Sequence, residues 1–201
     1  MYVKRPIKEY LDDLAARKPS PGGGSAAALS GAIGVGLMSM VANYTVGNPK
    51  YKNVEKNTAD ILIKVSTAKA DLERLLDADI EAYDKLSKAL TELPKGSQAL
   101  EDYFKKAADV PFEICKVTAD CLKLCKKLAG IGNKNLVTDT AIAAILLEGA
   151  FFSAKYNVYI NLKYIKDLDY IGDIHKVLAP LEESMPKLKE DILEMCEDAI
   201  K

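Results

Sequence analysis

The sequence predicts an all-α protein, a multi-helix up-and-down bundle around a central helix that carries no charge. Apolar residues recur at steps of three and four along most segments, and no segment alternates apolar and polar residues as a strand does. Two predicted helices are apolar on every side, which favours their enclosure by amphipathic helices. With 201 residues, 49% of them apolar and 28% charged, we expect one folded domain spanning residues 1–201.

The N-terminal part supplies the charge-free helix. Residues 7–17 predict a short amphipathic helix that ends where prolines impose extended backbone. The turn Pro21-Gly22-Gly23-Gly24-Ser25 then begins a helix that should end at Gly47-Asn48-Pro49, a left-handed glycine cap followed by a proline. Residues 25–47 are long enough for a membrane span. Their Ala, Gly, Ser and Asn content favours burial on all sides by protein, so we expect no membrane association.

The rest of the chain predicts further helices separated by clear turn signals. Residues 52–91 contain no Pro or Gly and predict one very long helix or two nearly collinear ones. The other predicted helices are 98–129 with a kink or restart at Pro111, 138–166 capped by Thr138 or Asp139, and 174–200 broken at Pro180 and Pro186.

Charge and cysteine content exclude several classes of function. The 28 basic and 29 acidic residues give a net charge of −1 and are spread along the chain, so no basic surface for nucleic acid is expected. Charged residues near the N-terminus interrupt any signal-peptide run, which favours a cytoplasmic protein with four free thiols. With a single histidine, His175, we expect neither a zinc site nor Ser-His or Cys-His nucleophilic catalysis.

Asp79 is the clearest polar residue at a position where an apolar one belongs. It continues an apolar seam formed by Leu72, Leu76, Tyr83 and Leu86. Burial of an unpaired carboxylate is costly, so Asp79 must be paired, protonated or in contact with a ligand. A buried ion pair, or a seam that drifts away from the core, remains the structural alternative.

Other candidates depend more on context. Asp139 at a helix start is either a functional carboxylate or a simple N-cap. The backbone N–H groups of the Gly22–Ser25 turn favour an anion or a carbonyl oxygen, although a tight capped turn explains them equally well. Amides from different helices either line a polar pocket or join the helices; they are Asn43, Asn133, Asn135, Asn157 and Asn161.

One family resembles this chain along nearly its whole length. The run PSPGGGSAAALSGAIGVGLMSMVANYT (19–45) resembles the opening of the formiminotetrahydrofolate cyclodeaminase/methenyltetrahydrofolate cyclohydrolase family. The similarity continues in order through 77–86, 108–114, 132–150 and 157–167. One position departs, because Thr138 stands where serine is usual in the family, and a cap tolerates either.

The resemblance implies a small helical homodimer that binds a tetrahydrofolate derivative and acts on its N5–N10 one-carbon bridge. It implies proton transfers without a metal or redox cofactor. The reaction we expect first is hydrolysis of 5,10-methenyltetrahydrofolate to 10-formyltetrahydrofolate. The alternative is cyclodeamination of 5-formiminotetrahydrofolate to the 5,10-methenyl form with release of ammonia. A non-catalytic helical interaction protein is the alternative from another class.

Within this hypothesis, Asp139 or Asp79 is the general acid/base. Ser25 and the N–H groups of Gly22, Gly23 and Gly24 are expected to contact the pterin edge or the one-carbon unit. Asn43, Asn133, Asn157 and Asn161 are expected to orient the pterin and the bridge, because the alternating donors and acceptors of the pterin match amides. Asn135 is expected to be a further substrate-binding residue. Lys50 or Lys134 would meet the glutamate-tail carboxylates, although either can simply be a solvated surface lysine.

Overall fold

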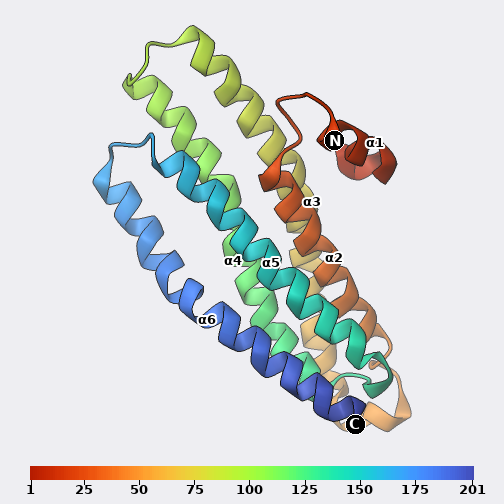
Figure 1. Cartoon of the computed structure of the whole chain (residues 1–201). Coiled ribbons are helices and arrows are strands. Elements are labelled where there is room, and N and C mark those ends of the chain that lie inside the picture. The colour runs from red at the N-terminus through yellow and green to blue at the C-terminus, as the bar shows by residue number, and fades with distance from the viewer.

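The computed structural model describes residues 1–201 and contains six α-helices and no strand, which confirms the predicted fold class (Figure 1). The helices are α1 Ile7–Ala15, α2 Gly23–Asn43, α3 Glu55–Glu92, α4 Gln98–Ile131, α5 Val137–Leu162 and α6 Leu168–Ile200. Single 3₁₀ turns precede α1, α3 and α5 at Tyr2–Lys4, Pro49–Val54 and Lys134–Leu136.

Helices α2 to α6 run alternately up and down the bundle, and α1 lies beside its upper half (Figure 1). Helix α2 packs against α3, α4 and α5, while α6 covers α4 and α5. The 38-residue α3 is one continuous helix, the first of the two predicted possibilities. Short turns join the helices, so sequential neighbours lie antiparallel.

The core lies where the two charge-free surfaces of α2 and α5 meet. Val35, Met38 and Val41 of α2 and Leu147 and Phe151 of α5 are fully buried. The helices approach closely because α2 has small residues at the contact. A Cβ on Gly34 would lie 3.2 Å from the backbone oxygen of Ala143 and 3.2 Å from Cγ of Leu147. The small residues of α2 therefore allow it to pack closely against α5.

The prediction that the charge-free helix is buried on all sides is wrong for a single chain. The outer faces of α2 and α5 carry apolar side chains that are 47–68% exposed, which we call the exposed apolar surface: Ile33, Ile142, Ile145 and Tyr156. By length and composition both helices could span a membrane. In the most apolar windows of these two stretches, 56% and 33% of the residues are buried. A chain folded alone leaves this surface without a partner.

Several predicted helix boundaries are also wrong. Helix α6 begins at Leu168 and runs through Pro180 and Pro186 without a break. Helix α4 also continues through Pro111, which is buried, so of the predicted kink or restart the restart is wrong. A proline removes one backbone hydrogen bond and bends a helix, but packing along the remaining turns maintains it. Helix α2 ends at Asn43, four residues before Gly47, whose positive φ of 73° matches the predicted left-handed glycine.

We expect Leu147→Ala to lower the free energy of unfolding by about 2–5 kcal/mol, because it leaves a cavity between α2 and α5. Ile63→Ala, at a 67% exposed position of α3, should cost less than about 1 kcal/mol and is the matched control. Urea unfolding followed by circular dichroism measures both. Equal losses for the two variants would contradict the assigned core.

Candidate functional site

A large pocket lies between α3, α4, α5 and the glycine turn that precedes α2. Its volume is about 850 Å³. At one end it is lined by Gly22, Gly23, Gly24, Asp79, Asn157 and Asn161. The structure therefore brings six of the twelve predicted site residues to one place, although they come from three separate parts of the chain.

The carboxylate of Asp79 lies against the backbone of Gly24. A Cβ on Gly24 would overlap both carboxylate oxygens, so only glycine fits beside this aspartate. A Cβ on Gly23 would lie 3.2 Å from Nδ2 of Asn157. The glycines therefore let the first turn of α2 approach side chains of α3 and α5. The seam residue Tyr83 is 44% exposed because it faces the same pocket.

Burial raises the pKa of Asp79 to about 6, and the backbone N–H of Ser25, which favours the carboxylate, opposes part of this rise. Asp79 has no ion-pair partner among the 201 residues. This excludes the buried ion pair that the sequence left open. A carboxyl group with a pKa near neutrality can accept and donate a proton at physiological pH.

The side chain of Ser25 supports the glycine turn from behind and does not face the pocket. It is fully buried, and its Oγ donates a hydrogen bond to the carbonyl oxygen of Gly22 at 2.8 Å and lies 3.1 Å from Oη of Tyr10. The backbone N–H of Gly22 also donates to this Oγ at 3.3 Å. The expected ligand contact of the Ser25 hydroxyl is therefore wrong. The backbone N–H group of Ser25, by contrast, hydrogen-bonds to the Asp79 carboxylate and lowers its pKa.

Asn157 and Asn161 lie one helical turn apart on α5 and point their amide groups toward backbone carbonyls. Nδ2 of Asn157 donates to the Ser153 oxygen at 2.9 Å. Nδ2 of Asn161 donates to the oxygens of Asn157 and Ala107 at 2.8 and 3.2 Å. Each amide is thus oriented by the protein, and its side-chain oxygen is left to accept a hydrogen bond from a ligand.

The middle of the pocket is apolar. Leu86 and Leu90 of α3 form one wall, and Phe104 of α4 stacks on Tyr164 with ring centroids 4.7 Å apart to form another. A flat aromatic group between these walls would find the contacts that aromatic rings prefer.

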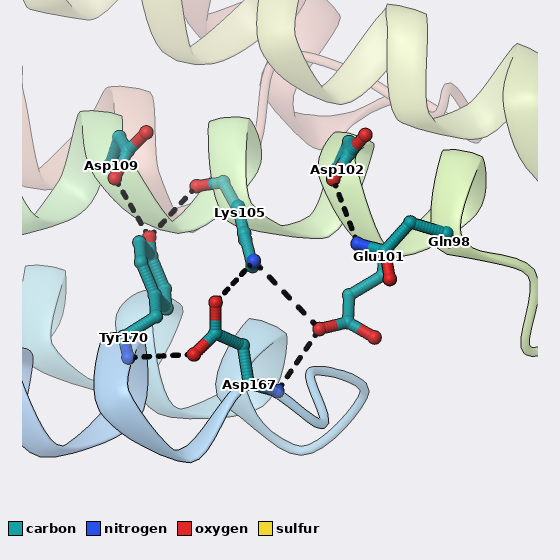
Figure 2. A network of polar contacts seen from close by, with 7 residues as sticks. All are labelled: Gln98, Glu101, Asp102, Lys105, Asp109, Asp167 and Tyr170. Carbon is teal, nitrogen blue, oxygen red and sulfur yellow. Dashed lines mark hydrogen bonds and ion pairs between the residues drawn. The ribbon is translucent and has the colours of Figure 1, made fainter.

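The far end of the pocket is polar and is built from the two turns that join α3 to α4 and α5 to α6. Glu101 of α4 is only 8% exposed, and its Oε1 accepts a hydrogen bond from the backbone N–H of Asp167 at 3.0 Å. Lys105 pairs with Asp167 at 2.8 Å and lies 3.9 Å from Glu101. Figure 2 shows this network, which Tyr170 extends by donating from its hydroxyl to Asp109 at 2.7 Å.

Six predicted site residues do not line this pocket. Besides Ser25, they are Asn43, Lys50, Asn133, Asn135 and Asp139. The latter five lie toward the other end of the bundle, because Asn43 ends α2 and Asp139 begins α5. A 26-residue helix spans about 39 Å, so the first turn of α5 is remote from Asn157. Within one chain, these residues therefore do not share a pocket with Asp79.

Asn133 has a structural role at that end. Its backbone N–H donates to Oγ1 of Thr45 at 2.9 Å and its Nδ2 to the oxygen of Tyr44 at 3.1 Å. Its Oδ1 accepts from the backbone N–H of Asn135 at 3.0 Å. Asn43 is exposed at the end of α2 and not deep within it. Asn133 therefore joins the 133–136 turn to the residues that follow α2, the structural alternative considered for it.

We expect Asp79→Asn to stabilise the fold in a pH-dependent way. Because the pKa of Asp79 is raised on folding, its ionisation destabilises the folded chain as the pH rises through about 6. The variant should gain up to about 3 kcal/mol at pH 8 and little at pH 4. Urea unfolding at both values measures this, with Asp60→Asn as the control on an exposed position of the same helix. A loss of stability at pH 8 would contradict the assigned burial.

Comparison with known proteins gives a consistent result along the chain. The sequence profile of the family described as formiminotransferase-cyclodeaminase matches residues 6–180. A methenyltetrahydrofolate cyclohydrolase of Methylorubrum extorquens is 35% identical over 94% of each chain. The formimidoyltransferase-cyclodeaminase of Sus scrofa is 29% identical over 89% of this chain, which spans 34% of that protein.

A solved structure agrees with these sequence matches. The crystal structure of formiminotetrahydrofolate cyclodeaminase from Thermotoga maritima superimposes with a TM-score of 0.93 at 34% identity, and all of each chain is covered. Both the profile and the relatives extend over the glycine turn, Asp79 and the two α5 asparagines. The chain belongs to the formiminotransferase-cyclodeaminase family.

Proposed function

We propose that this protein hydrolyses 5,10-methenyltetrahydrofolate to 10-formyltetrahydrofolate, with Asp79 as the general acid/base. The observation that carries the proposal is an unpaired carboxyl group with a pKa of about 6 in a large pocket. The end-to-end match with a methenyltetrahydrofolate cyclohydrolase supports this reaction. The match with a formiminotetrahydrofolate cyclodeaminase supports the alternative, cyclodeamination of 5-formiminotetrahydrofolate.

One carboxylate can carry out both proton transfers that opening of the N5–N10 one-carbon bridge requires. Asp79 accepts a proton from water as the water oxygen bonds to the bridge carbon. The neutral acid then returns that proton to N5 as the bond between N5 and the carbon breaks. The hydroxyl proton that remains leaves to solvent, and the product carries its formyl group on N10. A group that both accepts and donates works best when its pKa lies near the working pH.

In cyclodeamination, Asp79 would transfer protons at the same carbon, but between N10 and the departing nitrogen. N10 attacks the carbon of the protonated formimino group, an amidinium ion, and passes its own proton to Asp79, so that the former imino nitrogen becomes an NH₂ group. The acid then protonates the departing nitrogen, which leaves as ammonia. Both reactions need only proton transfer at a tetrahedral carbon between N5 and N10. We therefore propose that the enzyme uses no metal or redox cofactor.

The remaining residues of this end of the pocket have binding roles in the proposal. The oriented side-chain oxygens of Asn157 and Asn161 accept hydrogen bonds from the N–H groups of the pterin. Gly22, Gly23 and Gly24 allow the substrate and Asp79 to approach the first turn of α2 closely. The apolar middle of the pocket suits the benzoyl ring. A non-catalytic interaction bundle would need neither this pocket nor an unpaired buried carboxyl group.

We also propose that the protein works as a homodimer through the exposed apolar surface of α2 and α5. Both helices are long and apolar enough to cross a membrane, yet apolar side chains of each face solvent in the single chain. A second copy of this chain covers that surface with an identical one, the common arrangement of two-fold dimers. In this proposal a second protein chain, and not a membrane, covers the exposed apolar side chains of the two helices.

Activity assays separate the two predicted carboxylates. Asp79→Asn should lower kcat/KM for methenyl-ring opening by about 100-fold or more, the usual contribution of a general acid/base. Asp139→Asn, at the remote end of α5, should change it by less than about threefold. The decay of the near-ultraviolet absorbance of the methenyl form measures both, with the spontaneous rate subtracted.

The same assay tests the assigned pKa and the reaction. Wild-type kcat/KM should rise as the pH increases through about 6, because Asp79 must be ionised to accept a proton. Unchanged absorbance decay with wild-type protein, together with ammonia release from 5-formiminotetrahydrofolate, would replace hydrolysis by cyclodeamination. Inactivity on both substrates would contradict the proposed function.

For the dimer, we expect light scattering to give twice the chain mass of 21.9 kDa for the wild-type protein. Ile145→Glu should give monomers, because it places a charge in the apolar surface. Ile63→Glu, on an exposed position of α3, should leave the dimer intact. A monomeric wild-type protein would contradict the proposed homodimer.

A further inference from the structure

We propose that Tyr10 of α1 is a positioning residue for the reaction at Asp79. Its hydroxyl group holds Ser25, and Ser25 in turn presents its backbone N–H to the Asp79 carboxylate. This inference rests on the proposed function and adds to the site a residue that does not line the pocket. It also gives the N-terminal helix, which lies beside the bundle, a part in the reaction (Figure 1).

The hydroxyl group of Tyr10 is a hydrogen-bond donor to Ser25. Tyr10 is 2% exposed, and its Oη lies 3.1 Å from Oγ of Ser25. Two other groups meet that Oγ: the carbonyl oxygen of Gly22, at 2.8 Å, can only accept, and the N–H of Gly22, at 3.3 Å, can only donate. Since a serine hydroxyl has one hydrogen and two lone pairs, its hydrogen goes to the carbonyl oxygen. Tyr10 then donates to the second lone pair, and the serine hydroxyl is fully used.

Ser25 connects Tyr10 to Asp79 within a single residue. Its side chain faces Tyr10, while its backbone N–H hydrogen-bonds to the Asp79 carboxylate. The residues before it, Gly22 to Gly24, have no side chains that could fix the turn, and a glycine backbone is the most permissive. The hydrogen bonds of the Ser25 hydroxyl therefore take the place of side-chain contacts in fixing the start of α2.

Tyr10 is itself held against the bundle. It is the buried residue of α1, and the ring of Tyr2 packs edge-on against it with centroids 5.5 Å apart. The backbone N–H of Tyr2 donates to Oδ1 of Asp77 at 2.6 Å, and Asp77 is a 7% exposed residue of α3. Asp77 and Asp79 are two residues apart, so the N-terminal segment is attached to the part of α3 that carries the reacting carboxylate. Tyr10 thus has a fixed place relative to Asp79.

The ionisable groups around the pocket leave the Ser25 N–H as the main polar influence on Asp79. Burial raises the pKa of Asp79, the Ser25 N–H lowers it, and no charged side chain contributes. Helix α2 carries no charged residue. The other titratable residues that line the pocket come from α3, α4 and the two turns at its far end: Tyr83, Lys95, Glu101, Lys163, Tyr164 and Lys166. The state of the carboxylate therefore depends on how well the start of α2 is held.

The hydroxyl group of Tyr10 remains a donor over the pH range in which Asp79 titrates. Burial raises the pKa of Tyr10, the hydrogen bond with Ser25 opposes this rise, and the Asp79 charge adds to it. The pKa of Tyr10 therefore stays above the ordinary value of a tyrosine, and its proton is present throughout. Without this hydroxyl, Ser25 loses the donor behind it, and its N–H meets the carboxylate less well. Because Tyr10 does not line the pocket, substrate binding is not directly affected.

The test is the variant Tyr10→Phe, which keeps the ring and removes the hydroxyl group. Its kcat for methenyl-ring opening should fall by about threefold to tenfold, the effect of one lost hydrogen bond, while KM changes by less than about twofold. The rise of kcat/KM with pH should move upward by roughly 0.5 pH unit, because a weaker bond from the Ser25 N–H favours the neutral acid. The absorbance decay of the methenyl form, followed between about pH 5 and 8, measures both effects.

Tyr2→Phe is the matched control, because it removes a hydroxyl group from the neighbouring ring of the same segment. That hydroxyl donates to Oδ2 of Asp13 at 2.6 Å and not to Ser25. The control should keep kcat within about twofold of the wild-type value and leave the pH midpoint unchanged. Equal changes in the two variants would show that attachment of the N-terminal segment in general is responsible, and would overturn the role of the Tyr10 hydroxyl. An unchanged kcat and midpoint in Tyr10→Phe would overturn it too.

A double-mutant cycle tests the path through Ser25. If Tyr10 acts through Ser25, adding Tyr10→Phe to Ser25→Ala should lower kcat by less than about twofold further, although Tyr10→Phe alone lowers it several-fold. Losses that simply multiply in the double variant would contradict this path.

A titration without substrate separates this inference from the proposed reaction. Carbon-13 NMR of protein labelled at the aspartate carboxyl groups follows Asp79, whose signal is the one absent from Asp79→Asn. Its midpoint should be about 6 in the wild-type protein, higher in Tyr10→Phe and unchanged in Tyr2→Phe. A shifted titration in a protein that turns over neither folate substrate would support the positioning of Asp79 by Tyr10 and contradict the proposed function. Turnover with the same titration in all three proteins would support the function and overturn the role of Tyr10.

Discussion

The close approach of the Asp79 carboxylate to the first turn of α2 is the contact on which the site depends. It requires glycine at position 24, because any side chain there would overlap the carboxylate. It also requires Ser25 to hold the turn from behind through Gly22 and Tyr10. The N–H group of Ser25 then opposes part of the effect of burial, so that the pKa of Asp79 is held at about 6. The position of the Asp79 carboxylate therefore depends on both the glycine turn and the start of α2.

The sequence predicted the helical class and the importance of Asp79 because both depend on local pattern. A carboxylate in the seam of Leu72, Leu76 and Leu86 is visible without coordinates. The sequence could not show which amides share a pocket, because this depends on helix length and direction. Asn157 and Asp139 belong to the same predicted helix, yet they lie near its opposite ends. Lys95, Lys163 and Lys166 also line the pocket, and the sequence does not indicate this because they stand in turns without any periodic signal.

The breaks predicted at Pro180 and Pro186 were wrong for a related reason. A proline weakens a helix locally, but the contacts of α6 with α4 and α5 are made along its length and keep it continuous. The outer faces of α2 and α5 are a second case in which the sequence pattern alone misleads. Their apolar composition indicates burial, but within one chain these faces are only partly buried. Local pattern indicates that a surface must be covered, while only the assembly determines what covers it.

The 38-residue helix α3 carries Asp79 near its middle, and this fixes much of the proposed reaction site in advance. The carboxylate stands on a long helix, and α4 and α5 supply most of the other walls of the pocket. The segment before α2 completes these walls, because Pro19, Ser20 and Gly22 line the same pocket. Under the proposed function, the carboxylate therefore has its position before the substrate arrives, and residues 19–22 are a part of the wall that no helix holds.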